Sequence, residues 1–299
     1  MSKIVKKTKS KFKKYFKEFT SFIDEIDSHH IFLLSAGIAF NMILYIIPMF
    51  LLATYIMNKA FDINSVSIAI ERVLTDYLPP VDSTRKVLAS TLEELATISR
   101  NSSYAGWLGL ATIIWFSSTL FSSVRTGLNA VYSIETPNIF LFYRIKDILF
   151  TIILSILLIF TTYAIPMTSF VESVAQSVIP GDAGKLFSQF TYTLLTLISS
   201  FAFFYFIYTF VPNKSIPNRA RTISTIFCVV SIEVSRRLFA WYLSSVSNYG
   251  KVYGTYAVIV SLAIWVYYSA ILILLSAELG RFFDSRRKKF IRTRLAKRI

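Results

Sequence analysis

The chain has 299 residues, of which 54% are hydrophobic and 16% aromatic, and its formal net charge is +15. This composition excludes a disordered chain, which is poor in apolar residues, and an ordinary soluble domain, which is less apolar. The apolar residues form runs of about 20 or more, and the lysines gather at the two ends of the chain. That distribution predicts a helical protein that crosses a membrane several times.

Residues 1–30 form a basic head with an apolar stripe at helical spacing: Phe12, Phe16, Phe19, Ile23 and Ile26. Lysines occupy the other faces, so the pattern predicts an amphipathic helix that lies among the headgroups of the inner leaflet. A short coiled-coil seam is the alternative, although the pattern covers only about two heptads. His29 and His30 follow this stripe and are expected at the water interface.

Six apolar stretches are each long enough to cross a hydrocarbon core of about 30 Å as a helix. They lie at about 31–57, 104–124, 148–171, 190–211, 222–246 and 257–280. The fold class is therefore predicted to be all-α, with one transmembrane domain at 31–280. Pro48 is the expected bending point of the first and longest span.

The segment 58–103 carries two further apolar stripes, which Pro79 and Pro80 separate. We predict an extracytoplasmic helical hairpin that covers the outer mouth of the bundle. Two roles remain open for it: it either shields the ends of the spans or acts as a lid.

The distribution of Lys and Arg sets the expected orientation. Most of these residues lie in the head, in the tail 281–299 and in the loops on the same side of the membrane. The positive-inside rule then places both termini in the cytoplasm. The basic ends resemble nucleic-acid patches, but basic flanks of membrane spans are far commoner, and we expect them to bind anionic phospholipids and no nucleic acid.

Three charges interrupt the fifth predicted span: Glu233, Arg236 and Arg237. Each charge raises the free energy of membrane insertion by roughly 2.5–3.5 kcal/mol at the centre of a helix. Each Leu, Ile, Phe or Val lowers that free energy by only about 0.3–0.6 kcal/mol. Their spacing places them on one face, where they pair. Asn41 is predicted at a similar depth in the first span and completes a polar, substrate-binding chamber. A structural clamp between helices is the alternative.

A second polar contact is predicted at the inner end of the bundle. Glu278 ends the sixth span at the level of Arg125 and Asn129, which end the second span. We expect Glu278 to contact them, in a structural or gating role.

Catalytic chemistry finds little support in the residues. The two histidines are adjacent in sequence, so a histidine-based metal cluster is not expected, and no cofactor is predicted. The G-x-S-x-G turn of acyl-transfer enzymes is also absent from the sequence. We therefore expect a protein that is not an enzyme.

Three stretches carry a family resemblance: SAGIAFNMILYIIPMF at 35–50, GWLGLATIIWFSSTLFSSVRTGLNAVY at 106–132 and YGTYAVIVSLAIWVYYSAILILLSAEL at 253–279. They resemble the signature regions of the YihY/BrkB family of bacterial inner-membrane proteins. The resemblance covers 31–281 and implies six transmembrane helices. Some members are described as serum-resistance virulence factors, and some carry an old ribonuclease BN label. Ser276 departs from the pattern, in which a glycine is expected.

The functional hypothesis is transport or binding of a lipid-like or anionic envelope substrate. A structural or assembly protein of the envelope is the alternative, and an RNA-processing nuclease is a third possibility. The oligomeric state is left open.

Overall fold

The computed structural model of the chain describes residues 16–18, 20–60, 105–135, 143, 145–150, 153, 182–245 and 256–296. Within these ranges every regular element is a helix, which confirms the predicted all-α class. The long helices are α2 (Ile31–Ala60), α5 (Ala105–Val131), α7 (Asp182–Phe210), α8 (Asn218–Ser245) and α10 (Tyr256–Ala296). An N-terminal helical segment (Phe16–Ser28) precedes α2.

Four predicted spans overlap α2, α5, α7 and α8, although α5 ends seven residues after its predicted span and α7 begins eight residues before its own. Helix α10 extends beyond the sixth predicted span, past residue 280 to Ala296, as one helix of 41 residues. Lys and Arg are good helix formers, so the loss of hydropathy after residue 280 ends the apolar run without ending the helix. Of the third predicted span only residues 148–150 and 153 are described, and they are helical. The predicted hairpin lies outside the described residues, apart from 58–60, which end α2.

Two described helices are long and apolar enough to cross a membrane by themselves, at Thr193–Phe210 and Val260–Lys288. A third candidate arises if the N-terminal helical segment and Ile31–Ile46, which meet at a bend of 47°, form one span. Pro48 lies inside α2, and the helix continues through it. Whether it bends the helix stays a prediction.

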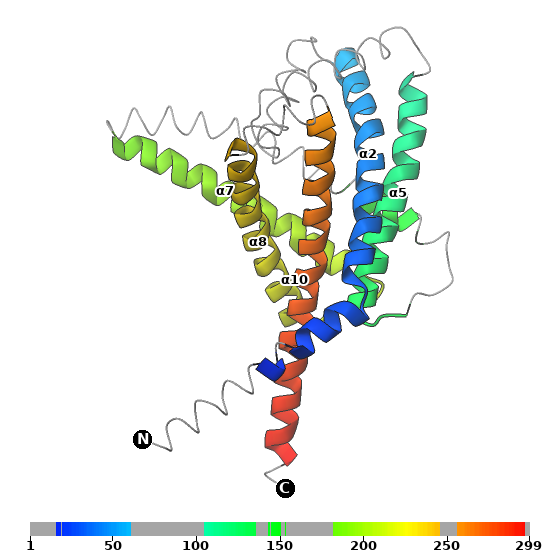
Figure 1. Ribbon diagram of the computed structural model, residues 1–299. Coiled ribbons are helices and arrows are strands. Elements are labelled where there is room, and N and C mark those ends of the chain that lie inside the picture. Colours follow the sequence, from blue (N-terminus) through cyan, green and yellow to red (C-terminus); the bar gives the residue numbers. More distant parts are fainter. Residues whose placement is uncertain are drawn as a thin grey trace.

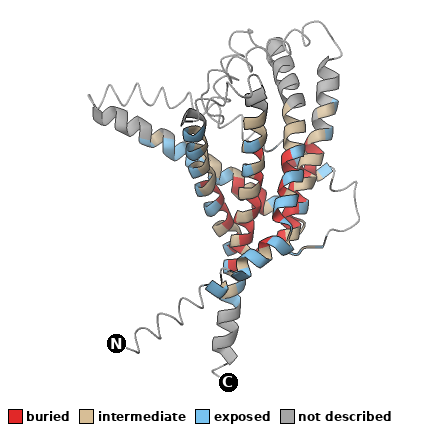
Figure 2. Cartoon of the chain, viewed as in Figure 1, coloured by how far each residue is buried: buried red, intermediate tan, exposed pale blue. Residues whose placement is uncertain are grey.

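Helix α10 stands at the centre of the described bundle, where it packs against α2, α5 and α8 (Figure 1). Helix α2 also packs along α5, and α7 packs against α8. The N-terminal helical segment and the C-terminal end of α10 lie at the same end of the described structure, which we call the base of the bundle (Figure 1). Buried residues gather in the part of the bundle nearest the base (Figure 2). That part is therefore the best packed of the described structure.

The outer faces of the helices carry many exposed, large apolar side chains. Examples are Phe32, Leu33, Phe40, Trp115, Phe190, Ile198, Val230, Leu238, Trp241 and Tyr268. A large exposed apolar surface marks a membrane or a partner as the neighbour of these faces. A helix that is apolar on most sides is typical of a membrane span.

Helices α8 and α10 cross through small residues. Ser276, Ala277 and Gly280 of α10 and Ala220 and Ser224 of α8 are all buried. Small side chains let two helix backbones approach closely, and such contacts are common between helices in membranes. Ser276, where the family pattern leads us to expect glycine, turns its hydroxyl back to the carbonyl oxygen of Leu272 at 2.6 Å.

The N-terminal helical segment packs against the part of α10 that follows residue 280. The rings of Phe22 and Phe282 meet edge to face at 5.2 Å, and Arg286 pairs with Glu18 at 2.5 Å. The predicted apolar stripe is divided: Ile26 is buried, Phe16 and Ile23 are exposed, and Phe12 and Phe19 lie outside the described residues. Part of the stripe therefore packs on protein instead of facing only headgroups.

Candidate functional site

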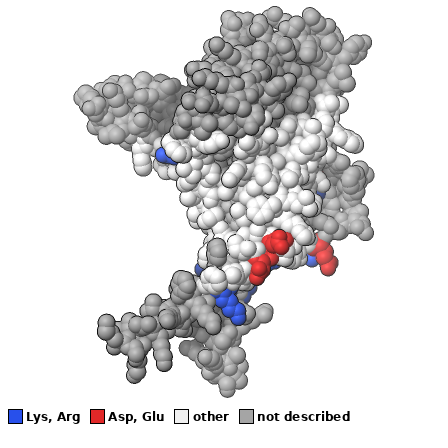
Figure 3. Space-filling view, in the orientation of Figure 1, with Lys and Arg blue, Asp and Glu red and all other residues white. Residues whose placement is uncertain are grey.

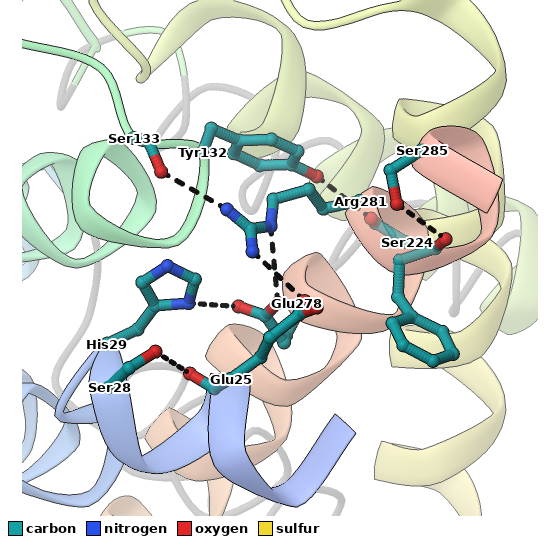
Figure 4. A network of polar contacts seen from close by, with 10 residues as sticks. Glu25, Ser28, His29, Tyr132, Ser133, Ser224, Glu278, Arg281 and Ser285 are labelled. Atoms are coloured by element: carbon teal, nitrogen blue, oxygen red, sulfur yellow. Dashed lines mark hydrogen bonds and ion pairs between the residues drawn. The ribbon is translucent and has the colours of Figure 1, made fainter. Parts of the chain in front are cut away.

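A network of polar side chains joins three parts of the chain at the base of the bundle (Figure 4). Glu278 of α10 accepts from Arg281 at 3.2 Å and contacts Nδ1 of His29 at 2.7 Å. Arg281 also donates to Glu25 at 3.0 Å and to Ser133 at 3.1 Å. We call Glu25, His29, Ser133, Glu278 and Arg281 the Glu278 network. It ties the N-terminal helical segment and the end of α5 to α10.

Two helix ends bring side chains into this network. His30 and Ser133 adopt positive φ angles of 50° and 51°. After α5, the Ser133 amide donates to Ala130 and the Ile134 amide to Asn129, which is the Schellman pattern that closes a helix. The His30 amide donates likewise to the carbonyl of Asp27. These caps hold the His29 and Ser133 side chains beside α10.

A second polar link joins the end of α5 to α8. The hydroxyl groups of Tyr132 and Ser224 are 3.1 Å apart. Burial raises the pKa of Tyr132 to about 12, because the phenolate would be poorly solvated there. Tyr132 is therefore neutral throughout the physiological pH range and remains able to donate a hydrogen bond.

The predicted contact of Glu278 with Arg125 and Asn129 is wrong. Arg125 forms a buried ion pair with Asp147 and lies 4.9 Å from the ring centroid of Tyr143. Asn129 instead accepts from the backbone amide of Asn213 at 3.1 Å. The reason is geometric: residues at one depth on two helices meet only if the faces that carry them point at each other.

The buried pair anchors the start of the third predicted span. Asp147 lies in the helical stretch 145–150, and Phe150 packs there between Phe121 of α5 and Phe206 of α7. Lys146 lies over the ring of Phe150 at 5.2 Å. Burial, with a smaller effect from the charge on Arg125, lowers the pKa of Lys146. This corner of the bundle therefore holds two cations beside one buried carboxylate.

The three charges of α8 pair with one another, as their spacing predicts. Glu233 accepts from Arg236 at 3.1 Å and from Arg237 at 3.0 Å. These interactions all lie within α8, near the middle of the helix. The side chains are 25%, 40% and 72% exposed, in chain order. We call these residues the α8 cluster.

Asn41 does not join the α8 cluster by any hydrogen bond among the described residues. It donates to the Ser123 hydroxyl of α5 at 2.6 Å and to the carbonyl oxygen of Gly37 at 3.0 Å. The amide nitrogen of Asn41 is thus engaged within α2 and in the contact between α2 and α5, and its role in substrate binding stays a prediction. A similar depth in the membrane did not determine in which direction the Asn41 side chain points from α2.

Acidic and basic side chains of the described residues gather at the base of the bundle, and a further basic patch is visible higher on the molecule (Figure 3). Among the described side chains, no group of three or more His, Cys, Asp or Glu residues is arranged to hold a metal ion. The groups that sequence reasoning missed are His29, Arg281 and Asp147. His29 and Arg281 could have been found from the sequence, because their predicted depth in the membrane is close to that of Glu278. Asp147 had a weaker signal, an acid directly before an apolar run.

The chain matches a known family along almost all of its length. The profile of the family described as "Virulence factor BrkB" matches residues 22–298. A UPF0761 membrane protein of Pseudoalteromonas translucida is 26% identical over 81% of this chain and 77% of its own length. The ribonuclease-like protein YfkH of Bacillus subtilis is 26% identical over 67% of this chain and 74% of its own length.

Some relatives match this chain over a smaller share of their own length. A UPF0761 membrane protein of Pseudoalteromonas atlantica is 27% identical over 62% of this chain, which covers 60% of that relative. No solved structure matches the chain.

Proposed function

Because the chain belongs to the BrkB virulence factor family, whose curated relatives include UPF0761 membrane proteins, we propose that it binds or moves an anionic, lipid-like substrate at the α8 cluster. The observation that carries the proposal is a set of ionised side chains near the middle of an apolar helix and partly exposed on its surface. Charged groups inside a membrane are expensive and usually mark a pathway or a binding site.

The charges of the α8 cluster are partly compensated within their own helix. Glu233 accepts hydrogen bonds from Arg236 and Arg237, three and four residues further along α8. Internal pairing lowers the cost of holding the charges in an apolar environment. It leaves the cluster with a net positive charge that suits an anionic headgroup.

Arg237 is the residue best placed to contact the substrate. Its side chain is 72% exposed, and among the described residues its hydrogen bond runs from Nε to Glu233. A guanidinium group has five N–H donors in a planar fork that fits two oxygens of a phosphate or carboxylate. The terminal nitrogens of Arg237 are therefore suited to a lipid phosphate.

The topology that we propose has six transmembrane helices and both termini in the cytoplasm, in the bacterial inner membrane. The long helices α2, α5, α7, α8 and α10 and the buried start of the third predicted span support this count. The excess of Lys and Arg on the terminal side supports the orientation. The basic ends would then face the anionic lipids of the inner leaflet.

The proposal contains no catalytic step. The ribonuclease-like name belongs to the Bacillus subtilis relative. Binding of a phosphate group by guanidinium donors requires neither a metal nor a hydrolytic residue.

Replacing Arg237 by glutamine tests the site. We expect the variant to bind fluorescent phosphatidylglycerol about tenfold or more weakly, because a hydrogen bond to a charged group contributes about 1.5–3 kcal/mol. Binding is measured on purified, folded protein in detergent, with phosphatidylcholine as the competitor without net charge. Arg236→Gln should weaken binding in the same direction.

Arg219→Gln is the matched control, since it removes the same group from an exposed position in the first turn of α8. It should leave the affinity unchanged. Equal affinity in Arg237→Gln and the unsubstituted protein, or an equal loss in the Arg219 control, would remove the α8 cluster as the binding site.

A further inference from the structure

The Glu278 network contains a buried acid in contact with a partly exposed histidine. We propose that His29 and Glu278 form a proton-binding pair on the terminal side of the bundle, in which His29 takes a proton from the aqueous phase and passes it to Glu278. The inference is independent of the α8 cluster and of its substrate. It assigns a second function, proton uptake, to a separate group of residues.

Burial isolates Glu278 from bulk water. Its side chain has 0% exposure, and it lies in α10 within the candidate membrane span Val260–Lys288. A carboxyl group in such a place exchanges a proton only through a neighbouring group, because no water reaches it directly. Acidic residues inside membrane helices commonly serve as proton sites.

Only one of the two basic groups that contact Glu278 can give up a proton. Arg281 contacts Oε1, and arginine stays protonated in proteins. His29 contacts Oε2 at 2.7 Å, and histidine is the side chain that ordinarily changes charge between about pH 5 and 8. His29 is also 15% exposed, so its ring reaches water on one side and the buried carboxylate on the other.

The backbone holds the imidazole ring in this position. The His29 amide donates to the carbonyl of Glu25 at 3.1 Å, and the following residue, His30, closes the helix with its positive φ of 50°. The ring is thereby fixed at the junction between the N-terminal helical segment and α2. A short, held contact is the geometry that proton transfer requires.

The transfer conserves charge within the network. The Nδ1–H bond of the imidazolium breaks and an Oε2–H bond forms, so a cation and an anion become two neutral groups. Arg281 then keeps Glu25 as its counter-ion at 3.0 Å. The neutral imidazole takes up the next proton from water.

The other titratable groups around Glu278 are Glu25, Asp284 and Tyr132. Glu25 of the N-terminal helical segment is a hydrogen-bonding neighbour of Glu278, is 32% exposed and pairs with Arg281, so it is a second route for a proton, and the His29→Asn variant distinguishes the two routes. Asp284 lies six residues further along α10 and pairs with Lys288 at 2.7 Å. Tyr132, at the end of α5, stays protonated because of its raised pKa, and α8 contributes the uncharged hydroxyl of Ser224.

Infrared difference spectroscopy on the full chain in lipid nanodiscs tests the pair. A step from about pH 8 to about pH 5, the range in which histidine changes charge, should produce a band of a protonated carboxyl group. Glu278→Gln should abolish that band, and Glu278→Asp, which keeps the acid, should shift its frequency. Glu135→Gln, at an exposed position just after α5 and outside both charged groups, is the matched control and should leave the band unchanged.

His29→Asn separates a proton carrier from a structural contact. Asparagine still donates a hydrogen bond but carries no exchangeable charge, so the Glu278 band should rise about a hundredfold more slowly after the pH step. Unchanged kinetics in folded His29→Asn, or an unchanged band in Glu278→Gln, would overturn the proposal. If Glu278→Gln fails to fold, the frequency shift in Glu278→Asp and the kinetics of His29→Asn decide the question.

Discussion

Replacing Asp147 by alanine is expected to destabilise the folded protein by about 3–5 kcal/mol, because the charge of Arg125 would be left buried without a partner. Both side chains of this ion pair are almost fully buried. Arg125 also lies against the ring of Tyr143, so it cannot turn to water without leaving its packed position. The change is measured as the shift in the thermal or denaturant unfolding midpoint, followed by tryptophan fluorescence.

Two further variants serve as controls for Asp147→Ala. Asp284→Ala breaks a pair whose lysine is well exposed, and such pairs contribute only about 0–1 kcal/mol. The double variant Arg125→Met with Asp147→Leu removes both charges and should recover most of the lost stability. A double variant no more stable than Asp147→Ala, or an equal loss in Asp284→Ala, would contradict this account.

The sequence predicted the features that local geometry determines. The pairing of Glu233 with Arg236 and Arg237 follows from the spacing of three and four residues along any helix, and the structure confirms it. The positions of α2, α5, α7 and α8 follow from the length of apolar runs. Neither prediction requires knowledge of how one helix meets another.

The sequence did not predict which side chains meet across helices. Depth along a span can be counted from the sequence, but the partner of a side chain also depends on rotation about the helix axis. Glu278 therefore meets His29, which is 249 positions away, while Arg125 meets Asp147. The αL caps at His30 and Ser133 that orient two of these contacts carry no glycine, the usual signal of such a cap.

The two charged groups differ in how the described side chains are bonded. The three charges of the α8 cluster pair along one helix and are partly exposed, and we propose this cluster as the ligand site. The Glu278 network bonds the N-terminal helical segment and α5 to α10, which suits a mechanical connection between helices. Protonation of Glu278 would weaken its contact with His29 or Arg281. Proton uptake would thereby change how α10 is held against the other helices.

Replacing Gly280 by alanine is expected to be the most damaging small substitution in the contact between α8 and α10. A Cβ atom at this position would lie 2.0 Å from the Ser224 hydroxyl oxygen and 2.5 Å from the backbone oxygen of Ala220. The hydroxyl can rotate away, but the carbonyl belongs to the α8 backbone, so the helices must separate. Overpacking of this kind costs about 1–3 kcal/mol or more.

Gly37→Ala is the matched control, because a Cβ atom at Gly37 meets nothing within 4 Å. Alanine is the better helix former by about 0.5–1 kcal/mol, so this variant should be neutral or more stable. Only Gly280→Ala is thus expected to lower the unfolding midpoint, although both variants replace glycine by alanine in a helix.

The double variant Ser224→Ala with Gly280→Ala identifies the atom responsible. Removing the Ser224 hydroxyl eliminates the 2.0 Å contact and leaves the 2.5 Å approach to the Ala220 carbonyl in place. Stability should therefore stay low, and the hydrogen bond between Ser224 and Tyr132 is lost as well. Full recovery would show that the hydroxyl alone obstructs alanine. The close approach of the two helix backbones would then not be what requires glycine at this crossing.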